Sequence, residues 1–403
     1  MALVLQGATP FAAGADDPQP RTQAEPPGQE ASEDERIDFE RARQLLRKEN
    51  RGEKLTDEDR AYLDRARAAR ARMRGQNPPA GNRPPGNRPP ALQASGEKGT
   101  VGLKPLAEMS ADDRYKGQDG GLYGGGRNEP PEEHLARALA AAKQIEPLDR
   151  EGRPSAEGRI VLISVGMSNT TQEFSAFVQL ASGDPERSRQ VVIVDGAQGG
   201  MDARAWAQPE QINRAGRQEP WTVLDRRLAQ AGVTPEQVQV VWLKQARINP
   251  GGIGEFPRHA EELAGHIQTI LHRLDEEFPN LRLAYLSSRI YAGYARGALN
   301  PEPYAYESAF AVRQLIQEQI AGEPSLNADS SKGEVKSPVL LWGPYLWGDG
   351  EQPRAADGLV WRRDDLAGDG THPSQSGRRK VGELLLEFFK SDPTARTWFL
   401  RNE

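Results

Sequence analysis

From residue 159 onward, short apolar runs alternate with longer segments whose apolar residues recur with helical spacing. Runs of this length bounded by polar residues are typical of buried strands. The predicted strands are 159–165, 190–195, 238–243, 281–288 and 339–343. The predicted helices that follow them are 172–181, 220–231, 257–277, 305–320 and 376–390, and a further helix is expected to start near Pro130. Strands and helices that alternate in this way predict an α/β domain with a parallel sheet covered by helices on both faces.

The pattern before residue 99 is different. Residues 1–33 hold few large apolar side chains after the first fourteen positions, so we expect them to be disordered. Residues 34–75 are charged and helix-favouring, broken at Gly52, and predict a helical hairpin whose second helix is capped by Thr56. Residues 76–98 contain a tandem Gly-Asn-Arg-Pro-Pro unit and predict an extended linker. The globular domain is therefore expected to span 99–403.

The first fourteen residues form a short apolar stretch that ends in small residues. This resembles the rear half of a secretory signal peptide, although the usual positive residues at its start are missing. We expect a secreted, periplasmic or envelope location, while the sequence leaves a cytoplasmic one open.

Composition narrows the classes of function. The 403 residues carry a formal net charge of −6 and no cysteine. A chain with a net negative charge has no overall positive field that would attract nucleic acid. The lack of cysteine excludes disulfides and thiolate metal sites. No apolar run approaches the length of a membrane-spanning helix, so no integral membrane segment is expected. Oligomeric state is not indicated.

Polar residues follow the first predicted strand as Gly166-Met167-Ser168-Asn169. In a parallel sheet, ligand sites lie at the carboxyl ends of the strands. A serine on a glycine-containing turn between strand and helix has an exposed hydroxyl beside the positive end of the helix. Ser168 is therefore a candidate nucleophile, and the alternative interpretation is an ordinary Ser/Asn helix cap.

A second polar pattern, Asp369-Gly370-Thr371-His372-Pro373-Ser374, precedes the last predicted helix. An aspartate three residues before a histidine on such a loop can orient the imidazole while the ring faces a serine elsewhere. The alternative is a loop histidine with a local carboxylate. We expect Ser168, His372 and Asp369 to act as a catalytic triad.

Taken in order, these blocks resemble the SGNH (GDSL-like) hydrolases over roughly residues 159–390. The similarity is greatest to the branch whose first block reads Gly-Gln-Ser-Asn, the sialate and acetylxylan esterase type. The resemblance implies a three-layer, flavodoxin-like α/β/α fold and hydrolysis of an acyl ester without a cofactor or metal. Three histidines on one predicted helix, His259, His266 and His272, have no acidic partners placed to complete a metal site.

The resemblance also suggests which groups stabilise the oxyanion. By analogy they are the N–H groups of Ser168 and Gly200, with Gly199 as the near alternative, and the side-chain amide of Gln245. Lys244 is the alternative to Gln245 and would bring a positive charge. Two departures from the family pattern are Met167, where many members have aspartate, and the third block, which follows the third predicted strand. This block reads Val241-Trp242-Leu243-Lys244-Gln245-Ala246 and lacks Gly-x-Asn-Asp.

Residues near the strand ends are candidates for substrate binding. Asn169, Gly199 and Lys244 come from the blocks above, Arg289 and Trp347 follow the fourth and fifth strands, and Tyr123 lies in the glycine-rich segment 119–128. Aromatic residues can stack on sugar rings, and arginine can bind a carboxylate or carbonyl group. These residues point to an acylated, and specifically an acetylated, carbohydrate as substrate. The alternatives are a non-catalytic carbohydrate-binding protein on the same scaffold and a hydrolase of lipids or other small esters.

Overall fold

The computed structural model describes residues 45, 55–75, 98–211 and 218–401. The chain divides into two units, residues 1–89 and 90–403. The predicted signal remnant, the disordered segment 1–33 and almost all of the linker 76–98 lie outside the described residues. So does the first helix of the predicted hairpin, apart from Leu45.

In the first unit, helix α2 spans Asp57–Gly75. Thr56 caps it, because its Oγ1 accepts a hydrogen bond of 3.1 Å from the N–H of Asp59. Leu45, Leu63 and Ala66 are buried together in a small apolar cluster of this unit.

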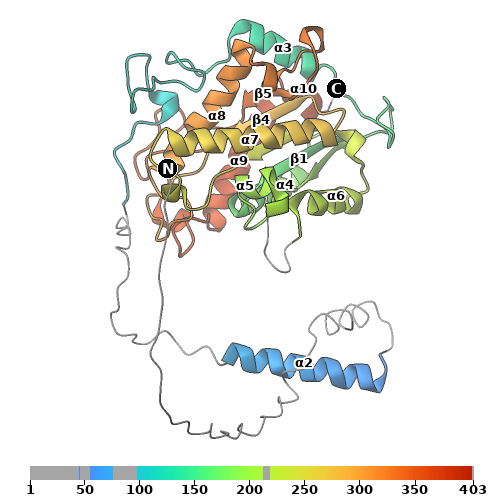
Figure 1. The fold of residues 1–403 in the computed structure, drawn as a ribbon. Coiled ribbons are helices and arrows are strands. Elements are labelled where there is room, and N and C mark those ends of the chain that lie inside the picture. The colour runs from blue at the N-terminus through green and yellow to red at the C-terminus, as the bar shows by residue number, and fades with distance from the viewer. Residues whose placement is uncertain (1–44, 46–54, 76–97, 212–217, 402–403) are drawn as a thin grey trace, which may run out of the picture. The chain divides into compact units, whose positions relative to one another are not determined.

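The second unit is built on one parallel sheet (Figure 1). The strand order is β2-β1-β3-β4-β5, which is the flavodoxin-like order. The strands are β1 (Ile160–Gly166), β2 (Val191–Val194), β3 (Val238–Lys244), β4 (Leu283–Ser287) and β5 (Val339–Trp342). The expected α/β class with a parallel, flavodoxin-like sheet is confirmed. Every residue of β1 and β3 is buried, which explains why the sequences of these central strands are nearly continuous apolar runs.

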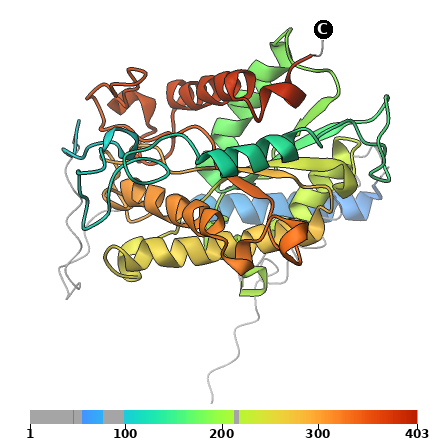
Figure 2. The same ribbon diagram turned by 90° about the horizontal axis from the view of Figure 1, so that it is seen from above.

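Helices cover both faces of the sheet. Figure 2 shows α9, in red, and α4, in green, on one side and α7, in yellow, and α8, in orange, on the other. The helices are α3 (Glu132–Ala142), α4 (Ser168–Gly183), α5 (Ala203–Ala207), α6 (Pro220–Gln230), α7 (Arg258–Glu277), α8 (Tyr304–Ala321), α9 (Gln375–Ser391) and α10 (Arg396–Phe399). Short 3-10 turns lie at Leu106–Glu108, Pro209–Gln211, Pro235–Gln237, Pro250–Gly252, Pro324–Leu326, Ser330–Lys332 and Arg363–Asp365. None of the helices within the described ranges is long and apolar enough to cross a membrane.

Helix α4 starts at Ser168, four residues before the predicted start at 172. Its first turn, Ser-Asn-Thr-Thr, is made of residues that favour caps over helix interiors, so the sequence signal is weak there. The turn is held by tertiary contacts instead, since Thr170 Oγ1 donates a hydrogen bond of 2.8 Å to the carbonyl oxygen of Lys244. The nucleophile candidate therefore belongs to the helix and not to a loop.

Side chains close the outer edge of β5. The Leu340 N–H donates to Gln319 Oε1 at 2.8 Å, and the Leu340 carbonyl oxygen lies 2.7 Å from His134 Nε2. Two residues further on, the backbone N–H of Trp342 donates to the hydroxyl of Tyr123 at 3.4 Å. Contacts from α8, α3 and the glycine-rich segment thus occupy hydrogen-bonding groups that an edge strand leaves unpaired.

Candidate active site

The turn between β1 and α4 brings the backbone close to the end of β3. A Cβ atom added at Gly166 would lie 2.4 Å from the carbonyl oxygen of Lys244 and 2.4 Å from Thr170 Oγ1, so only glycine fits. Ser168 follows as the first residue of α4, after Met167 in an extended conformation. This places its hydroxyl at the carboxyl edge of the sheet, between β1 and β3, where the order of strands reverses.

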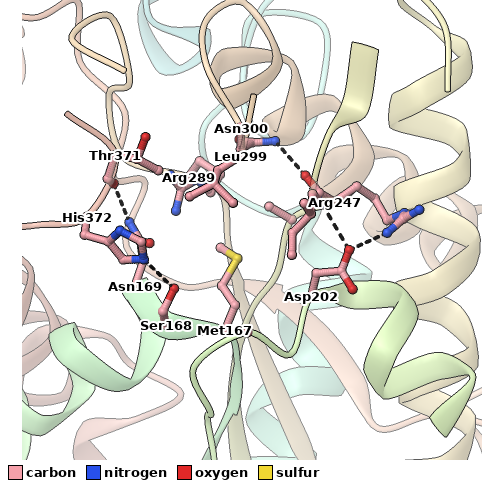
Figure 3. Close-up of a pocket in the computed structure, with 13 residues that line it drawn as sticks. Met167, Ser168, Asn169, Asp202, Arg247, Arg289, Leu299, Asn300, Thr371 and His372 are labelled. Carbon is pink, nitrogen blue, oxygen red and sulfur yellow. Dashed lines mark hydrogen bonds and ion pairs between the residues drawn. The ribbon is translucent and has the colours of Figure 1, made fainter. Parts of the chain in front are cut away.

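Ser168, His372 and Asp369 form a continuous hydrogen-bonded series (Figure 3). Ser168 Oγ lies 2.7 Å from His372 Nε2, and His372 Nδ1 lies 2.5 Å from Asp369 Oδ2. With Asp369 accepting from Nδ1–H, the neutral ring leaves Nε2 free to accept the serine proton. The two distant sequence patterns therefore meet in the geometry that a serine hydrolase requires.

Local hydrogen bonds fix the loop that carries Asp369 and His372. Asp369 Oδ1 accepts from the N–H of Thr371 at 2.9 Å and from the N–H of His372 at 3.0 Å. Gly370 has a positive φ of 67°, and a Cβ there would lie 1.8 Å from the carbonyl oxygen of Tyr294. Asn169 Nδ2 donates to the Thr371 carbonyl oxygen at 2.9 Å, which ties the start of α4 to this loop.

The same contacts favour the charged form of Asp369. Partial burial raises the pKa of its carboxyl group, but the hydrogen bonds from the His372 N–H, the His372 ring and the Thr371 N–H outweigh burial. The pKa of Asp369 is therefore lower than its ordinary value. An ionised Asp369 can stabilise the imidazolium that forms when His372 takes a proton.

A cavity of about 210 Å³ opens beside the Ser168–His372 pair. It is lined by Met167, Ser168, Asn169, Gly200, Asp202, Ala246, Arg247, Ile248, Arg289, Leu299, Asn300, Thr371 and His372. The lining comes from loops after β1, β2, β3 and β4 and from the loop before α9. This position agrees with the general rule for parallel sheets.

The predicted oxyanion donors lie at or next to this cavity. Gly200 lines it, and a Cβ added at Gly199 would be 4.0 Å from Ser168 Cβ. Gln245 is buried directly before Ala246, which lines the cavity, and neither atom of its amide has a hydrogen-bond partner among the described residues. Gln245 itself is not part of the lining.

Lys244 is placed away from the cavity. Its ammonium group is fully buried and forms an ion pair with Glu173 of α4, which is also fully buried. Burial lowers the pKa of Lys244 to about 8, against the opposing effect of Glu173. The side chain thus serves a buried charge pair in this structure and does not reach the substrate space.

Tyr123 and Trp347 are also packed in the interior. The Tyr123 side chain is buried beside β5, where its hydroxyl lies 3.4 Å from the Trp342 N–H. Trp347 is fully buried and donates from Nε1 to Glu302 Oε1 at 2.8 Å. Of the predicted substrate-binding residues, the structure brings Asn169 and Arg289 into the cavity wall and Gly199 beside Ser168.

Several lining residues were not predicted from the sequence. Asp202 caps α5 and forms an ion pair with Arg247, whose carbonyl oxygen accepts a hydrogen bond of 3.3 Å from Asn300 Nδ2. Leu299, with 40% of its surface exposed, comes from the same long loop between β4 and α8 as Asn300. The sequence indicated these residues only through their position in loops that follow β2, β3 and β4. They belong to no motif that would have singled them out.

Two of the three histidines of α7 make structural contacts. His259 Nε2 lies 2.6 Å from Glu307 Oε2, and His272 Nε2 lies 2.6 Å from the carbonyl oxygen of Ser325. Across the described ranges, no group of three or more histidine, aspartate or glutamate side chains is arranged to hold a metal ion.

No protein-family model matches this chain, and no curated protein matches its sequence. Among solved structures, it is similar to a protein of Bacteroides fragilis NCTC 9343 whose structure is titled as that of a "putative acylhydrolase". The identity is 12%, the TM-score is 0.33, and the match covers 64% of this chain and 96% of that one.

Proposed function

We propose that the protein is a serine esterase that removes short acyl groups, and specifically acetyl groups, from a carbohydrate or related alcohol. The observation that carries this proposal is the series from Ser168 Oγ through His372 to Asp369, with distances of 2.7 and 2.5 Å, at the wall of a cavity. The resemblance of the Gly-x-Ser-Asn and Asp-x-x-His blocks to SGNH hydrolases supports the same assignment.

The chemistry follows from the positions of these groups. His372 removes the proton of Ser168 as Oγ attacks the ester carbonyl carbon, and Asp369 stabilises the imidazolium. The Ser168 N–H lies in the first turn of α4, where backbone donors have no partner within the helix and the helix dipole favours negative charge. Together with Gly200 and the Gln245 amide, it is the proposed oxyanion site. His372 then returns its proton to the leaving alcohol, and water releases the acyl group by the reverse sequence.

The size of the cavity supports a short acyl group. Pockets that enclose drug-sized ligands are roughly 300–1,000 Å³, whereas this one has about 210 Å³. An acetyl group fits this space, and a long acyl chain would extend beyond it. A lipase is therefore the weaker candidate.

Hydrolysis of 4-nitrophenyl acetate by the full chain tests the proposal. Wild type and a Ser182→Ala control, which removes an exposed hydroxyl from the same helix, should both be active. Ser168→Ala and His372→Ala should each lose nearly all activity, by a factor on the order of 10⁶ in kcat in a comparable triad. Activity that survives in Ser168→Ala would refute the assignment. Glycan binding unaffected by Ser168→Ala, with no esterase activity in wild type, would favour a non-catalytic binding protein.

A further inference from the structure

Asp195 follows β2 directly, and its carboxylate joins three segments that lead to the catalytic cavity. Its Oδ1 accepts a hydrogen bond of 2.7 Å from Ser164 Oγ of β1 and one of 3.2 Å from the N–H of Ala197. Its Oδ2 accepts from Thr171 Oγ1 at 2.5 Å and from Ser175 Oγ at 3.2 Å, and both of these residues belong to α4. One side chain thus connects the central strand β1, the helix α4 and the loop after β2.

Two of these segments carry the backbone donors proposed for the oxyanion site. Ser168 is the first residue of α4, three residues before Thr171. Gly200 comes three residues after Ala197 in the loop that follows β2, and it lines the cavity. The separation of the Ser168 and Gly200 N–H groups therefore depends on how α4 is held against this loop. Asp195 forms hydrogen bonds to both segments.

The backbone of the loop after β2 fits closely against β1. The Gln198 N–H donates to the carbonyl oxygen of Gly166 at 3.0 Å. A Cβ atom added at Gly196 would lie 2.5 Å from the carbonyl oxygen of Ser164. The carboxylate of Asp195 continues this attachment from β1 to the first turns of α4.

An amide could replace the Asp195 carboxyl group with little change in its contacts. Burial raises the pKa of Asp195, against the opposing effects of the Thr171 and Ser164 hydroxyls, the Arg227 charge and the Ser175 hydroxyl. Asparagine has the same shape and is neutral. The hydroxyls of Thr171 and Ser175 can accept hydrogen bonds as well as donate them, so they can bond to the NH₂ group of an asparagine. Alanine would remove all of these contacts.

We propose that Asp195 is a positioning residue for the oxyanion site, which sets the separation of the Ser168 and Gly200 N–H groups by holding α4 to the loop after β2. This inference rests on the proposed esterase function. Oxyanion donors act mainly in the transition state, where the negative charge develops. A change in their position should therefore lower kcat and leave KM nearly unchanged. A misplacement on the order of 1 Å can cost about 10²-fold in rate.

Hydrolysis of 4-nitrophenyl acetate by variants of the full chain tests the inference. Asp195→Ala should lower kcat by about 10²-fold with a KM close to that of wild type. Asp195→Asn should recover most of this loss. Thr171→Val, which removes one hydrogen bond on the α4 side, should lower kcat to a smaller extent. The double variant Asp195→Ala/Thr171→Val should be no worse than Asp195→Ala, because both substitutions break the same connection.

Asp184 supplies a matched control at the opposite end of α4. It is half-buried like Asp195, and its carboxylate pairs with Lys390 of α9 at 2.9 Å. Asp184→Ala should lower the Tm and leave kcat unchanged. A merely structural role of Asp195 would give Asp195→Ala the same behaviour, so the pair of variants separates a loss of stability from a loss of position.

The outcomes separate this inference from the proposed function. Ser168-dependent hydrolysis with an unchanged kcat in Asp195→Ala would overturn the role of Asp195 and leave the esterase function standing. A loss in Asp195→Asn as large as that in Asp195→Ala would also overturn it. If Asp195→Ala does not fold, Thr171→Val decides: a lower kcat at constant KM supports the inference, and an unchanged kcat overturns it. Absence of hydrolysis in wild type would refute the proposed function and this inference with it.

Discussion

The polar groups of the Asp369–His372 loop differ from those of the buried charged residues near the ends of β3 and β4. The Asp369 carboxylate is hydrogen-bonded throughout, whereas some atoms of the buried charged residues have no hydrogen-bond partner among the described residues. Asp369 has 44% of its side chain exposed, yet its carboxylate accepts hydrogen bonds from two backbone N–H groups and the His372 ring. Glu173, Lys244 and Arg289 are almost completely buried, and atoms of Glu173 and Arg289 lack partners among the described residues. The first region holds a reactive group in place with local bonds, whereas the second depends on a few charge pairs. Substitutions in the loop should therefore affect activity, and substitutions in the Glu173–Lys244 pair should affect stability.

Asp369→Asn should produce the largest effect and should act on catalysis. Without the carboxylate, His372 is held in the wrong tautomer and its protonated form is not stabilised, so kcat should fall by about 10⁴-fold. Steady-state kinetics with an acetate ester measures the effect. Asp364→Asn, an exposed aspartate of the preceding turn, should behave as wild type. A loss of less than tenfold in Asp369→Asn would contradict the role given to Asp369.

Lys244→Met should act on stability. It leaves the Glu173 carboxylate buried without its cation, and breaking a buried pair in this way costs about 3–5 kcal/mol of unfolding free energy. Urea unfolding measures the cost. The double variant Lys244→Met/Glu173→Leu removes both charges and should recover most of the loss. Equal destabilisation by the single and double variants would show that packing, and not charge, holds this region.

Glu302 offers a test through pH. Its carboxylate is buried and accepts hydrogen bonds from the N–H groups of Ala292 and Tyr306 and from Trp347 Nε1. Burial raises the pKa of Glu302 to about 7 despite these bonds. A pKa raised by folding means that the stabilisation is present below about pH 4.5 and is lost as pH rises through 7. Glu302→Gln should reduce this fall by on the order of 2–3 kcal/mol in urea unfolding at pH 4.5 and 8. The same pH dependence in both proteins would rule out Glu302 as its source.

Asn169→Ala should give the smallest effect, since it removes one hydrogen bond between α4 and the Asp369–His372 loop. Loss of its hydrogen bond to the Thr371 carbonyl oxygen should cost about 1 kcal/mol of unfolding free energy. Because this bond helps to hold His372 against Ser168, kcat should fall several-fold while the pH profile keeps its shape. Thermal unfolding and kinetics on the same sample measure both. Full activity in Asn169→Ala would show that the loop is positioned by its own hydrogen bonds alone.

The sequence predicted the sheet well because its central strands are buried on both faces. Apolar runs at 159–165 and 238–243 correspond to β1 and β3, whose residues are all buried. The start of α4 was not predicted, because polar cap-forming residues occupy a first turn that is fixed by the contact of Thr170 with the end of β3. The short helices α5 and α10 have too few residues for a periodic signal.

The candidate site could be predicted only where a motif restricts the chemistry. Ser168, Asp369 and His372 occur in short patterns with glycine at the positions that the turns require. Aromatic residues gave no such restriction, and Tyr123 and Trp347, which were expected to contact substrate, are packed in the interior. Leu299 and Asn300 line the cavity from a loop whose sequence has no motif. Their positions depend on the path of that loop, which local pattern does not determine.

The closed edge of β5 has a consequence for assembly. Because Gln319 and His134 occupy the N–H and carbonyl oxygen of Leu340, another chain cannot extend the sheet at this strand without displacing both. Self-association by β-augmentation, and the fibrillar aggregation that follows the same route, are therefore blocked on this side.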